Sequence, residues 1–422
     1  MVKLNFKMAL ALSVVTSVNS HASTVLDSIK NGTFSGGLFN TLELGSNSGA
    51  SGVGANNNAK VLGSALTLDY VTGDYYGFNI GVGSETGYDW GIQDSDTATT
   101  AGGENDSRVN VNATNLYRAF INYRFNSALT NTQIRVGRQD ITSPLLMTSG
   151  AFPMRDSFDA VVIENKDIPD TILRAMYVTK WNMRYGDDNN GSVTQTDKSY
   201  DNPLVSFYLN NKSIDNLNIE AQWLQNDNDE NAGDPPAAVT AKNYDTTFLA
   251  LDYNIPNSSW TVGAKTLSAN FENSADTGYQ GAFVKNTFNG VGVQLAYTTV
   301  DDAANFPGTL GHVPMLRSYN PGMQGEYFAG LKTTSIAANY GFNITGFKAT
   351  LGYTTWQQSV EGIKNSRGTD LDDGYEASLR IDYKSQEIKG LSTVMQLSYI
   401  NYDQDVADDS LTILRTSLNY QF

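Results

Sequence analysis

The chain ends in the stretch Leu411-Thr-Ile-Leu-Arg-Thr-Ser-Leu-Asn-Tyr-Gln-Phe422, in which apolar and polar side chains alternate. One parity carries Leu414, Leu418, Tyr420 and Phe422, and the other carries Arg415, Ser417, Asn419 and Gln421. Because successive side chains of a strand point to opposite faces of a sheet, this segment has an apolar and a polar face. A soluble protein would leave such a strand as a bare edge, whereas a closed membrane barrel pairs it with the first strand. We therefore predict an all-β, antiparallel transmembrane barrel with lipid outside and a water-filled lumen inside.

The start of the chain has the pattern of a signal peptide. Lys3 and Lys7 precede an apolar run from Met8 to Val18, and Ser20-His21-Ala22 offers small residues at a cleavage site. This run is about eleven residues long, too short for a membrane-spanning helix, which needs roughly twenty. We expect residues 1–22 to be removed and residues 23–422 to form one barrel domain in the outer membrane of a Gram-negative bacterium. The removed part holds two lysines and no other charge, so the formal net charge changes from -16 to -18.

Composition narrows the class further. The chain has no cysteine, which excludes disulfides, cysteine metal sites and a cysteine nucleophile. It has no run of eighteen apolar residues, which excludes helical membrane spans. Its 38 Gly, 23 Tyr and 18 Phe against 10 Pro are typical of many strands and turns, with aromatic residues available for the two membrane interfaces.

Alternation recurs along the whole chain, in segments of about ten residues, the length that a tilted membrane strand needs. We predict eighteen strands, at 33–45, 60–71, 76–89, 113–125, 131–139, 158–165, 171–182, 203–210, 217–226, 244–253, 260–270, 278–286, 291–300, 331–341, 346–356, 374–384, 391–402 and 411–422. The links between them alternate between short and long, as they do between the periplasmic turns and external loops of an outer-membrane barrel. This asymmetry predicts that both termini lie in the periplasm.

The polar parity of the strands predicts the lining of the lumen. A charge on the lipid face costs up to about 2 to 4 kcal/mol near the membrane midplane, so charged strand residues should face inward. The basic members are Arg118, Arg124, Arg135, Arg174, Lys180, Arg380, Lys384 and Arg415. The acidic members are Glu43, Asp69, Glu220, Asp252, Glu376 and Asp382. On the strand 113–125, the same alternation assigns Tyr117 to the outward face.

The excess negative charge lies in the long loops, with acidic runs around Asp94, Asp187, Asp229, Asp370 and Asp403. Charge runs on exposed loops are usually solvated surface. Two sharper hypotheses remain open: divalent-cation binding, although no run matches the calcium loop of fixed spacing, and an electrostatic bias on ion entry.

The link after the fifth strand is apolar rather than acidic. It contains Leu145, Leu146, Met147, Phe152 and Met154 and is poorly suited to solvent. We expect this loop to fold inward against the barrel wall and to narrow the pore.

Two short blocks of sequence flank or precede this link. They are Val136-Gly137-Arg138-Gln139 with Ser157-Phe158, and Leu66-Thr67-Leu68-Asp69-Tyr70 followed by Gly73 and Gly77-Phe78. Through these blocks the chain resembles the OprD-type family of substrate-specific porins. The resemblance implies an eighteen-stranded channel whose third loop constricts the lumen, here through Leu145, Leu146, Phe152, Pro153, Arg155 and Asp156. The same architecture also resembles the general major porins, which select mainly by size and charge.

The resemblance further implies a ladder of basic side chains that guides small carboxylates past an acidic pocket. Arg118, Arg124, Arg135 and Arg174 would form one side, with Arg380, Lys384 and Arg415 across the barrel. The alternative for each is a pair with an acid across the strand, with no specific task. One departure concerns the loop: the family often has Asp-Ser-Arg where this chain has Thr148-Ser149-Gly150, and Arg155 and Asp156 are the nearest substitutes.

The aromatic ending Leu418, Tyr420 and Phe422 resembles the signal read by the barrel-insertion machinery. Other expected partners are outer-membrane lipid, lipopolysaccharide and small hydrophilic solutes, and association into homotrimers stays open. We expect no catalytic residue, metal, cofactor or nucleic acid, because phosphate loops, metal-ligand spacings and basic stripes are missing. A barrel hydrolase would depend on His312 alone once His21 leaves with the signal peptide, and an adhesin or receptor acting through its external loops is the remaining alternative.

Overall fold

The computed structural model describes residues 24–47, 60–88, 90–92, 109, 111–150, 152–184, 197–228, 243–272, 274–307, 309–310, 328–363, 371–402 and 410–422. Three of the sequence-based expectations lie outside these residues. They are the signal peptide at 1–22, His312, and the acidic positions Asp94, Asp187, Asp229, Asp370 and Asp403.

In the described residues, one short helix and eighteen strands make up the fold. They are α1 (Val25–Lys30), β1 (Thr33–Asn47), β2 (Lys60–Val71), β3 (Phe78–Tyr88), β4 (Thr114–Arg124), β5 (Thr132–Gln139), β6 (Ser157–Asn165), β7 (Thr171–Asn182), β8 (Lys198–Asn211), β9 (Leu217–Asn226), β10 (Tyr244–Asn254), β11 (Thr261–Phe271), β12 (Thr277–Phe288), β13 (Val291–Val300), β14 (Leu331–Tyr340), β15 (Phe347–Gln358), β16 (Gly374–Lys384), β17 (Leu391–Asn401) and β18 (Ser410–Gln421). Every predicted strand is confirmed. The largest difference is at β8, which begins at Lys198 rather than at 203, and α1 was not anticipated. In the described ranges, no helix is long and apolar enough to cross a membrane.

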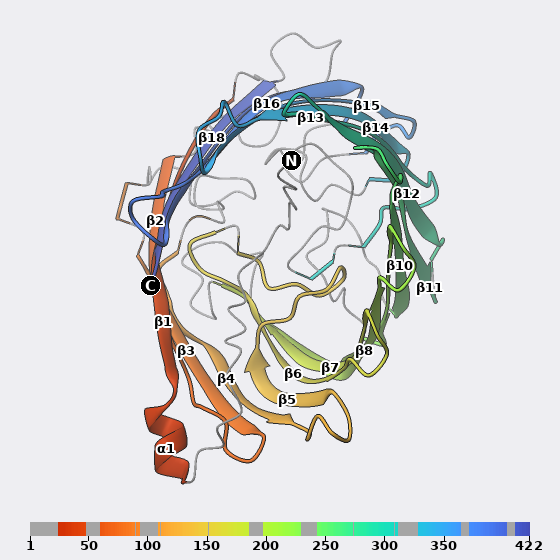
Figure 1. Cartoon of the computed structure of the whole chain (residues 1–422). Helices are drawn as coiled ribbons and strands as arrows, with labels where there is room; N and C mark the ends of the chain where they lie inside the picture. Colours follow the sequence, from red (N-terminus) through yellow and green to blue (C-terminus); the bar gives the residue numbers. More distant parts are fainter. Residues whose placement is uncertain are drawn as a thin grey trace.

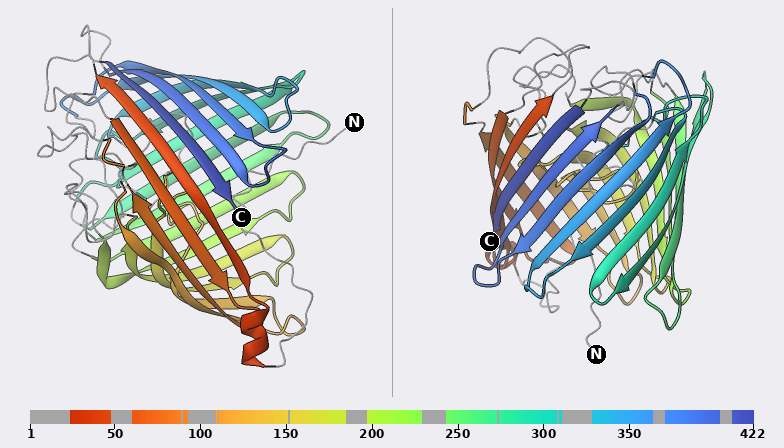
Figure 2. Two further views of the ribbon diagram at one scale, coloured as in Figure 1. Left: turned by 90° about the vertical axis from the view of Figure 1, so that its left-hand side faces the viewer. Right: turned by 90° about the horizontal axis from the view of Figure 1, so that it is seen from above.

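The strands form one closed antiparallel sheet in which each strand pairs with its neighbours in sequence and β1 pairs with β18. Figure 1 looks along the resulting ring, and Figure 2 shows the tilt of its strands. The ring closes at the last residue, because the Phe422 amide donates to the Gly36 carbonyl at 3.0 Å and the Gly36 amide donates back at 3.1 Å. We call the end of the barrel with short links, such as 125–131 and 385–390, the short-turn end, and the other the long-loop end.

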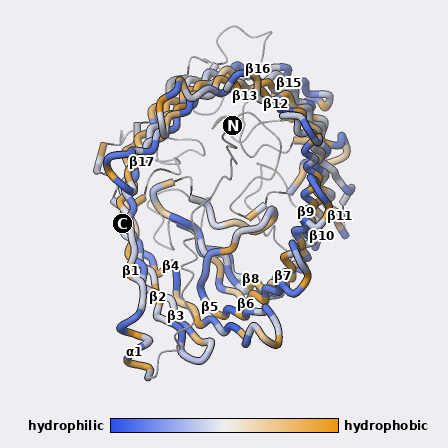
Figure 3. The backbone as a smooth tube through the Cα atoms, in the orientation of Figure 1, coloured by the Kyte–Doolittle hydropathy of each residue, from blue (hydrophilic) through white to orange (hydrophobic). Residues whose placement is uncertain are grey.

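The two faces of the wall differ as the alternation predicts, and Figure 3 shows hydrophilic and hydrophobic positions following one another along the strands. Outward apolar residues are exposed, with Ile121 at 54% and Leu351 at 63%. At the short-turn end the outward face carries aromatic pairs, among them Phe78 with Tyr123 at 4.5 Å between ring centroids. The outer surface is therefore apolar with an aromatic edge, as a lipid-facing wall requires.

A β-bulge in β4 corrects the predicted direction of Tyr117. Gly83 pairs with Arg118 and Ser84 pairs with Leu116, so Tyr117 is an extra residue in the ladder. The bulge turns both Tyr117 and Arg118 into the lumen, and Tyr117 is only 1% exposed. Gly83 makes room for them, since a Cβ there would lie 2.4 Å from Asp69 Oδ1. Tyr117 therefore belongs to the polar interior, not to the lipid face.

A second bulge, at Thr179 in β7, overturns the placement of Lys180. Ala160 pairs with Val178 and Asp159 pairs with Lys180, so Thr179 is skipped. Asp159 also pairs with Arg138 of β5. Both lie on the outward face of their strands, because they have the parity of the exposed residues Ile163 and Val136. Lys180 accordingly lies on the outer side, where its Nζ contacts Asp197 Oδ2 at 2.7 Å, while Trp181 turns inward. A one-residue insertion exchanges the faces of all residues beyond it.

Candidate functional site

The inner loop, residues 140–156 between β5 and β6, lies inside the ring, where Figure 1 shows it in yellow. It begins as a tight hairpin, because Thr142 bridges Met147 and the Thr148 amide donates to the Ile141 carbonyl at 2.7 Å. Ser143 closes the turn through its amide and its hydroxyl, which both donate to the Leu146 carbonyl. The hairpin therefore satisfies its own backbone and presents its apolar tip to the wall.

That tip is bound to the part of the wall formed by β8 and β9. The Leu145 amide donates to Gln222 Oε1 in β9 at 2.7 Å, and Gln222 Nε2 donates in turn to Ser206 Oγ in β8 at 2.9 Å. On its other side the tip pairs with Leu310, whose amide donates to the Leu145 carbonyl at 3.1 Å. Leu145 and Leu146 are completely buried in an apolar cluster that includes Phe158, Trp181 and Phe248. Apolar burial and hydrogen bonds together hold the hairpin inside the barrel.

Arg174 of β7 joins the wall to the same hairpin. Its Nη1 donates to the Thr142 carbonyl at 2.6 Å, and its Nε donates to Glu164 Oε2 at 2.6 Å. Its guanidinium also lies over the Tyr208 ring, 5.3 Å from the centroid. One arginine thus uses its fixed fork of donors to position a backbone carbonyl of the loop.

The second half of the inner loop is held between two arginines. The guanidinium carbons of Arg184 and Arg415 lie 4.5 Å and 5.0 Å from the centroid of the Phe152 ring. Arg184 binds the fully buried Asp156 through Nη2 at 2.9 Å and Nε at 3.1 Å. Arg415 of β18 donates to Glu43 Oε2 of β1 at 2.7 Å through Nε. Each cation over the ring therefore carries its own carboxylate partner.

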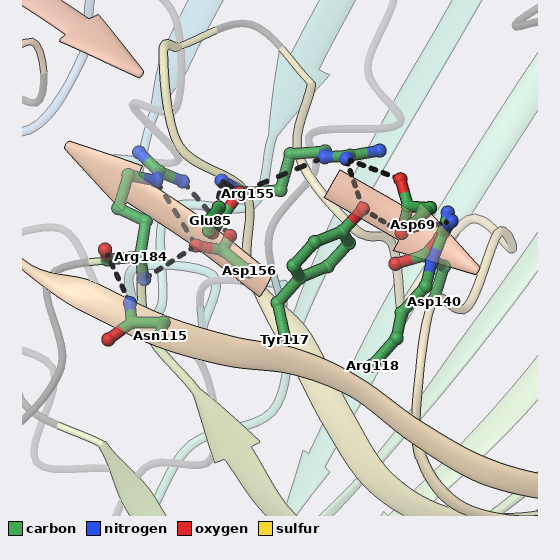
Figure 4. A network of polar contacts seen from close by, with 9 residues as sticks. All are labelled: Asp69, Glu85, Asn115, Tyr117, Arg118, Asp140, Arg155, Asp156 and Arg184. Atoms are coloured by element: carbon green, nitrogen blue, oxygen red, sulfur yellow. Dashed lines mark hydrogen bonds and ion pairs between the residues drawn. The ribbon is translucent and has the colours of Figure 1, made fainter. Parts of the chain in front are cut away.

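Figure 4 shows the polar network behind this loop segment, where Arg155 meets the wall of β2 to β4. The Arg155 amide donates to Glu85 Oε1 at 3.0 Å, and its Nη2 donates to the Tyr117 hydroxyl at 2.5 Å. Tyr117 donates to Asp69, which also binds Arg118 Nη1 at 3.0 Å. The network holds the three arginines Arg118, Arg155 and Arg184 and the four carboxylates Asp69, Glu85, Asp140 and Asp156. Each of these arginines already contacts a carboxylate of the network, so this cluster locks the loop and is not in itself an anion site.

No protein-family model matches the chain, and no curated protein matches its sequence. Solved structures match it closely in shape. OpdO of Pseudomonas aeruginosa has a TM-score of 0.70 at 14% identity, covering 94% of this chain and 98% of that chain. OccAB1 of Acinetobacter baumannii also gives 0.70 at 14% identity, covering 94% and 97%. OpdK of Pseudomonas aeruginosa, solved with vanillate, gives 0.67 at 11% identity, covering 93% and 99%.

The chain has the fold of the OprD/Occ channels. This agreement over nearly the whole chain confirms the predicted closed barrel of eighteen antiparallel strands. The fold that the OprD-type resemblance implies is confirmed with it.

Against the ladder expected of an OprD-type channel, most basic residues of the wall are already paired. The ion pairs are Arg118 with Asp69 and Asp140, Arg174 with Glu164, Arg380 with Asp382, and Arg415 with Glu43. Arg124 and Lys384 are exposed at the short-turn end of their strands. Pairing across strands, the simpler alternative, therefore describes the larger part of the set.

Arg135 differs from the other arginines of the wall. It is half-buried on β5, its guanidinium lies 4.5 Å over the centroid of the Phe120 ring, and its Nε has no hydrogen-bond partner. Among the residues that the structure describes, no carboxylate lies within ion-pair distance of it. Arg135 is thus a half-buried arginine of the wall that has no ion-pair partner among the described residues.

The acids predicted for the lumen all occupy inward positions: Glu43, Asp69, Glu220, Asp252, Glu376 and Asp382. Glu220 accepts a hydrogen bond from the Tyr208 hydroxyl at 2.7 Å, and Asp382 also lies 3.8 Å from Lys348 Nζ. In the described part of the chain, no group of three or more histidine, cysteine, aspartate or glutamate side chains is arranged to hold a metal ion.

The sequence analysis missed four residues that hold the inner loop: Glu85, Asp140, Arg184 and Gln222. Glu85 and Gln222 lie on the polar parity of predicted strands, and this parity could have indicated that both face the lumen. Arg184 and Asp140 lie just beyond strand ends, where alternation no longer indicates a direction. None of the four has a neighbour in sequence that reveals its partner.

Proposed function

We propose that this protein is an outer-membrane channel through which small hydrophilic solutes diffuse passively, without chemistry and without an energy source. The observation that carries the proposal is the inner loop, which crosses into a closed barrel of the OprD/Occ fold. It is anchored on β9 through Gln222 and on β18 through Arg415. A barrel of this size needs such an obstruction to become selective, because 16 to 18 strands otherwise enclose a wide aqueous channel.

The solutes that suit this lumen best are small organic carboxylates. No described carboxylate lies within ion-pair distance of Arg135, and a half-buried charge attracts more strongly than one in bulk water. Vanillate, with which OpdK was solved, is a carboxylate on an aromatic ring and belongs to the same class. The sites at Arg124 and Lys384 would add weak attraction at one mouth.

The orientation follows the lengths of the links. The short-turn end would face the periplasm, and with it both Thr24 at the start of the described chain and Phe422 at its end. The long-loop end would face the exterior. Outer-membrane lipid and lipopolysaccharide would surround the apolar wall, and the chain would insert through its terminal residues Leu418, Tyr420 and Phe422.

Planar-bilayer recording tests the proposal. With a tenfold gradient of potassium gluconate, the proposal predicts discrete open-channel currents and a reversal potential displaced toward that of the anion. Liposome swelling with sorbitol should show passage of a neutral solute of similar size. The absence of channels, or a strong preference for potassium in both chloride and gluconate, would overturn it.

A further inference from the structure

The helix α1 (Val25–Lys30) is docked on the outside of the short-turn end. The Ser28 hydroxyl donates to the Gly73 carbonyl at 2.5 Å, and the Gly73 amide donates to the Ser28 carbonyl at 2.9 Å. The Tyr70 hydroxyl donates to the Ile29 carbonyl, and the Asp27 amide bonds to the Thr24 hydroxyl, which caps the helix at 3.1 Å. A helix this short is not stable alone, so these contacts with the turn after β2 fix its orientation.

One face of this docked helix is apolar and bare. At about 100° per residue, Val25, Ile29 and Leu26 fall within one arc of about 100°, while Ser28 points to the barrel. Val25 and Leu26 are each 57% exposed and Ile29 is 49% exposed. The polar residue Asp27 lies on the opposite side of the helix. Such a division is the pattern of a helix that lies in a membrane interface.

The position of the helix agrees with that pattern. Figure 1 shows α1 at the outer edge of the ring, clear of the lumen, and Figure 2 shows it at the short-turn end of β1. Tyr70, which contacts it, is paired with Phe34 and Val82, and these outward residues are 60% and 48% exposed. The bare face of α1 thus continues the apolar outer wall of the barrel.

We propose that α1 is an interfacial anchor that lays Val25, Leu26 and Ile29 into the boundary between head groups and acyl chains of the leaflet next to the short turns. Lys30, in the last turn, can reach the phosphate layer. Three side chains are far too few for a stable protein interface, which buries roughly 1,200 to 2,000 Å², whereas a lipid surface continues from the wall itself. The inference rests on the membrane-spanning barrel of the proposed function.

The absence of cysteine in the chain permits a direct test with single spin labels. Nitroxide labels at Leu26→Cys, Ile29→Cys, Asp27→Cys and, on the lipid-facing wall, Leu351→Cys are measured in phosphatidylcholine–phosphatidylglycerol vesicles. Power saturation compares access of oxygen, which enters lipid, with access of a water-soluble nickel complex. We expect the oxygen-to-nickel ratio at 26 and 29 to exceed that at 27 several-fold and to approach that at 351. Unchanged single-channel conductance confirms that each labelled variant is folded.

Each of the other possible results contradicts the proposal. If the nickel complex reaches the labels at 26 and 27 equally, while the label at 351 is still reached mainly by oxygen, α1 is not an interfacial anchor. The membrane-spanning barrel would be unaffected by this result. A label at 26 that neither reagent reaches indicates a protein partner and also overturns the anchor. If the nickel complex reaches the label at 351, the wall does not face lipid. This result would contradict the membrane-spanning barrel and, with it, the proposed function.

Discussion

The ring centroid of Phe152 lies 5.0 Å from the guanidinium carbon of Arg415, so the inner loop contacts the last strand of the barrel. Arg415 also binds Glu43 across the closure between β18 and β1. The side chain that helps to close the ring therefore also holds the obstruction inside it.

Replacement of Arg415 by methionine should loosen the loop. The change keeps the length of the side chain but removes the cation over Phe152 and leaves Glu43 without its partner. Loss of a hydrogen bond between charged groups costs about 1.5 to 3 kcal/mol. We expect noisier single-channel currents and a shift of the reversal potential toward cations. Lys384→Met, on an exposed lysine at the short-turn end, is the control, and equal effects of both variants would contradict this role.

The hydrogen bond from Leu145 to Gln222 should contribute measurably to stability. Gln222→Leu leaves a buried backbone amide unsatisfied, which costs about 1 to 3 kcal/mol. Thermal unfolding in detergent should therefore occur at a lower temperature, and single channels should open to more than one level. Gln225→Leu changes the outward face of the same strand and should have little effect. A Gln222 variant as stable and as quiet as the wild type would show that the tip needs no such anchor.

Substitutions at Arg135 and Lys180 distinguish a residue that faces the lumen from one on the outer wall. Arg135→Met should displace the reversal potential in a potassium gluconate gradient toward cations, because it removes a half-buried inward cation that has no ion-pair partner among the described residues. Lys180→Met should not, because the bulge at Thr179 places that lysine outside, beside Asp197. Equal displacement by the two variants would mean that the register of β7 is wrong.

The end of the chain should matter for insertion more than for transport. Phe422 closes the ring through its backbone, and its ring lies 6.3 Å from that of Phe34. Phe422→Ala should lower the amount of folded protein in the outer membrane several-fold, measured by heat-modifiable migration on gels. Phe342→Ala, in a turn where that residue is 56% exposed, is the control. Normal yields of folded Phe422→Ala with altered conductance would show that Phe422 acts in transport and not in insertion.

The strands were predictable because alternation with a period of two is a local property. The outward direction of Ile121 and the inward direction of Arg415 follow directly from it. The start of β8 was misplaced because its pairing with β7 jumps from Leu204 to Ser199, and the irregular residues between them break the alternation. The bulges at Tyr117 and Thr179 were invisible because tyrosine and lysine occur on either face, and an inserted residue leaves no mark in composition.

The site was less predictable than the wall. The apolar character of Leu145 and Leu146 indicated that the loop turns inward, but not which strand receives it. Gln222 and Arg415 lie far along the chain from the loop, and only closure of the barrel brings them to it. Arg118 pairs with Asp69 and Asp140, and Arg174 pairs with Glu164 of the neighbouring strand, which removes both arginines from the predicted ladder.

The most direct test of the account is the single-channel conductance of a variant that lacks residues 145–152. This deletion removes the hairpin tip bound to Gln222 and the ring between Arg184 and Arg415, and it leaves every wall strand in place. Retained heat-modifiable migration would show that the barrel still forms. The account predicts a larger conductance and weaker discrimination between gluconate and potassium than in the wild type. A folded variant with unchanged conductance would contradict it.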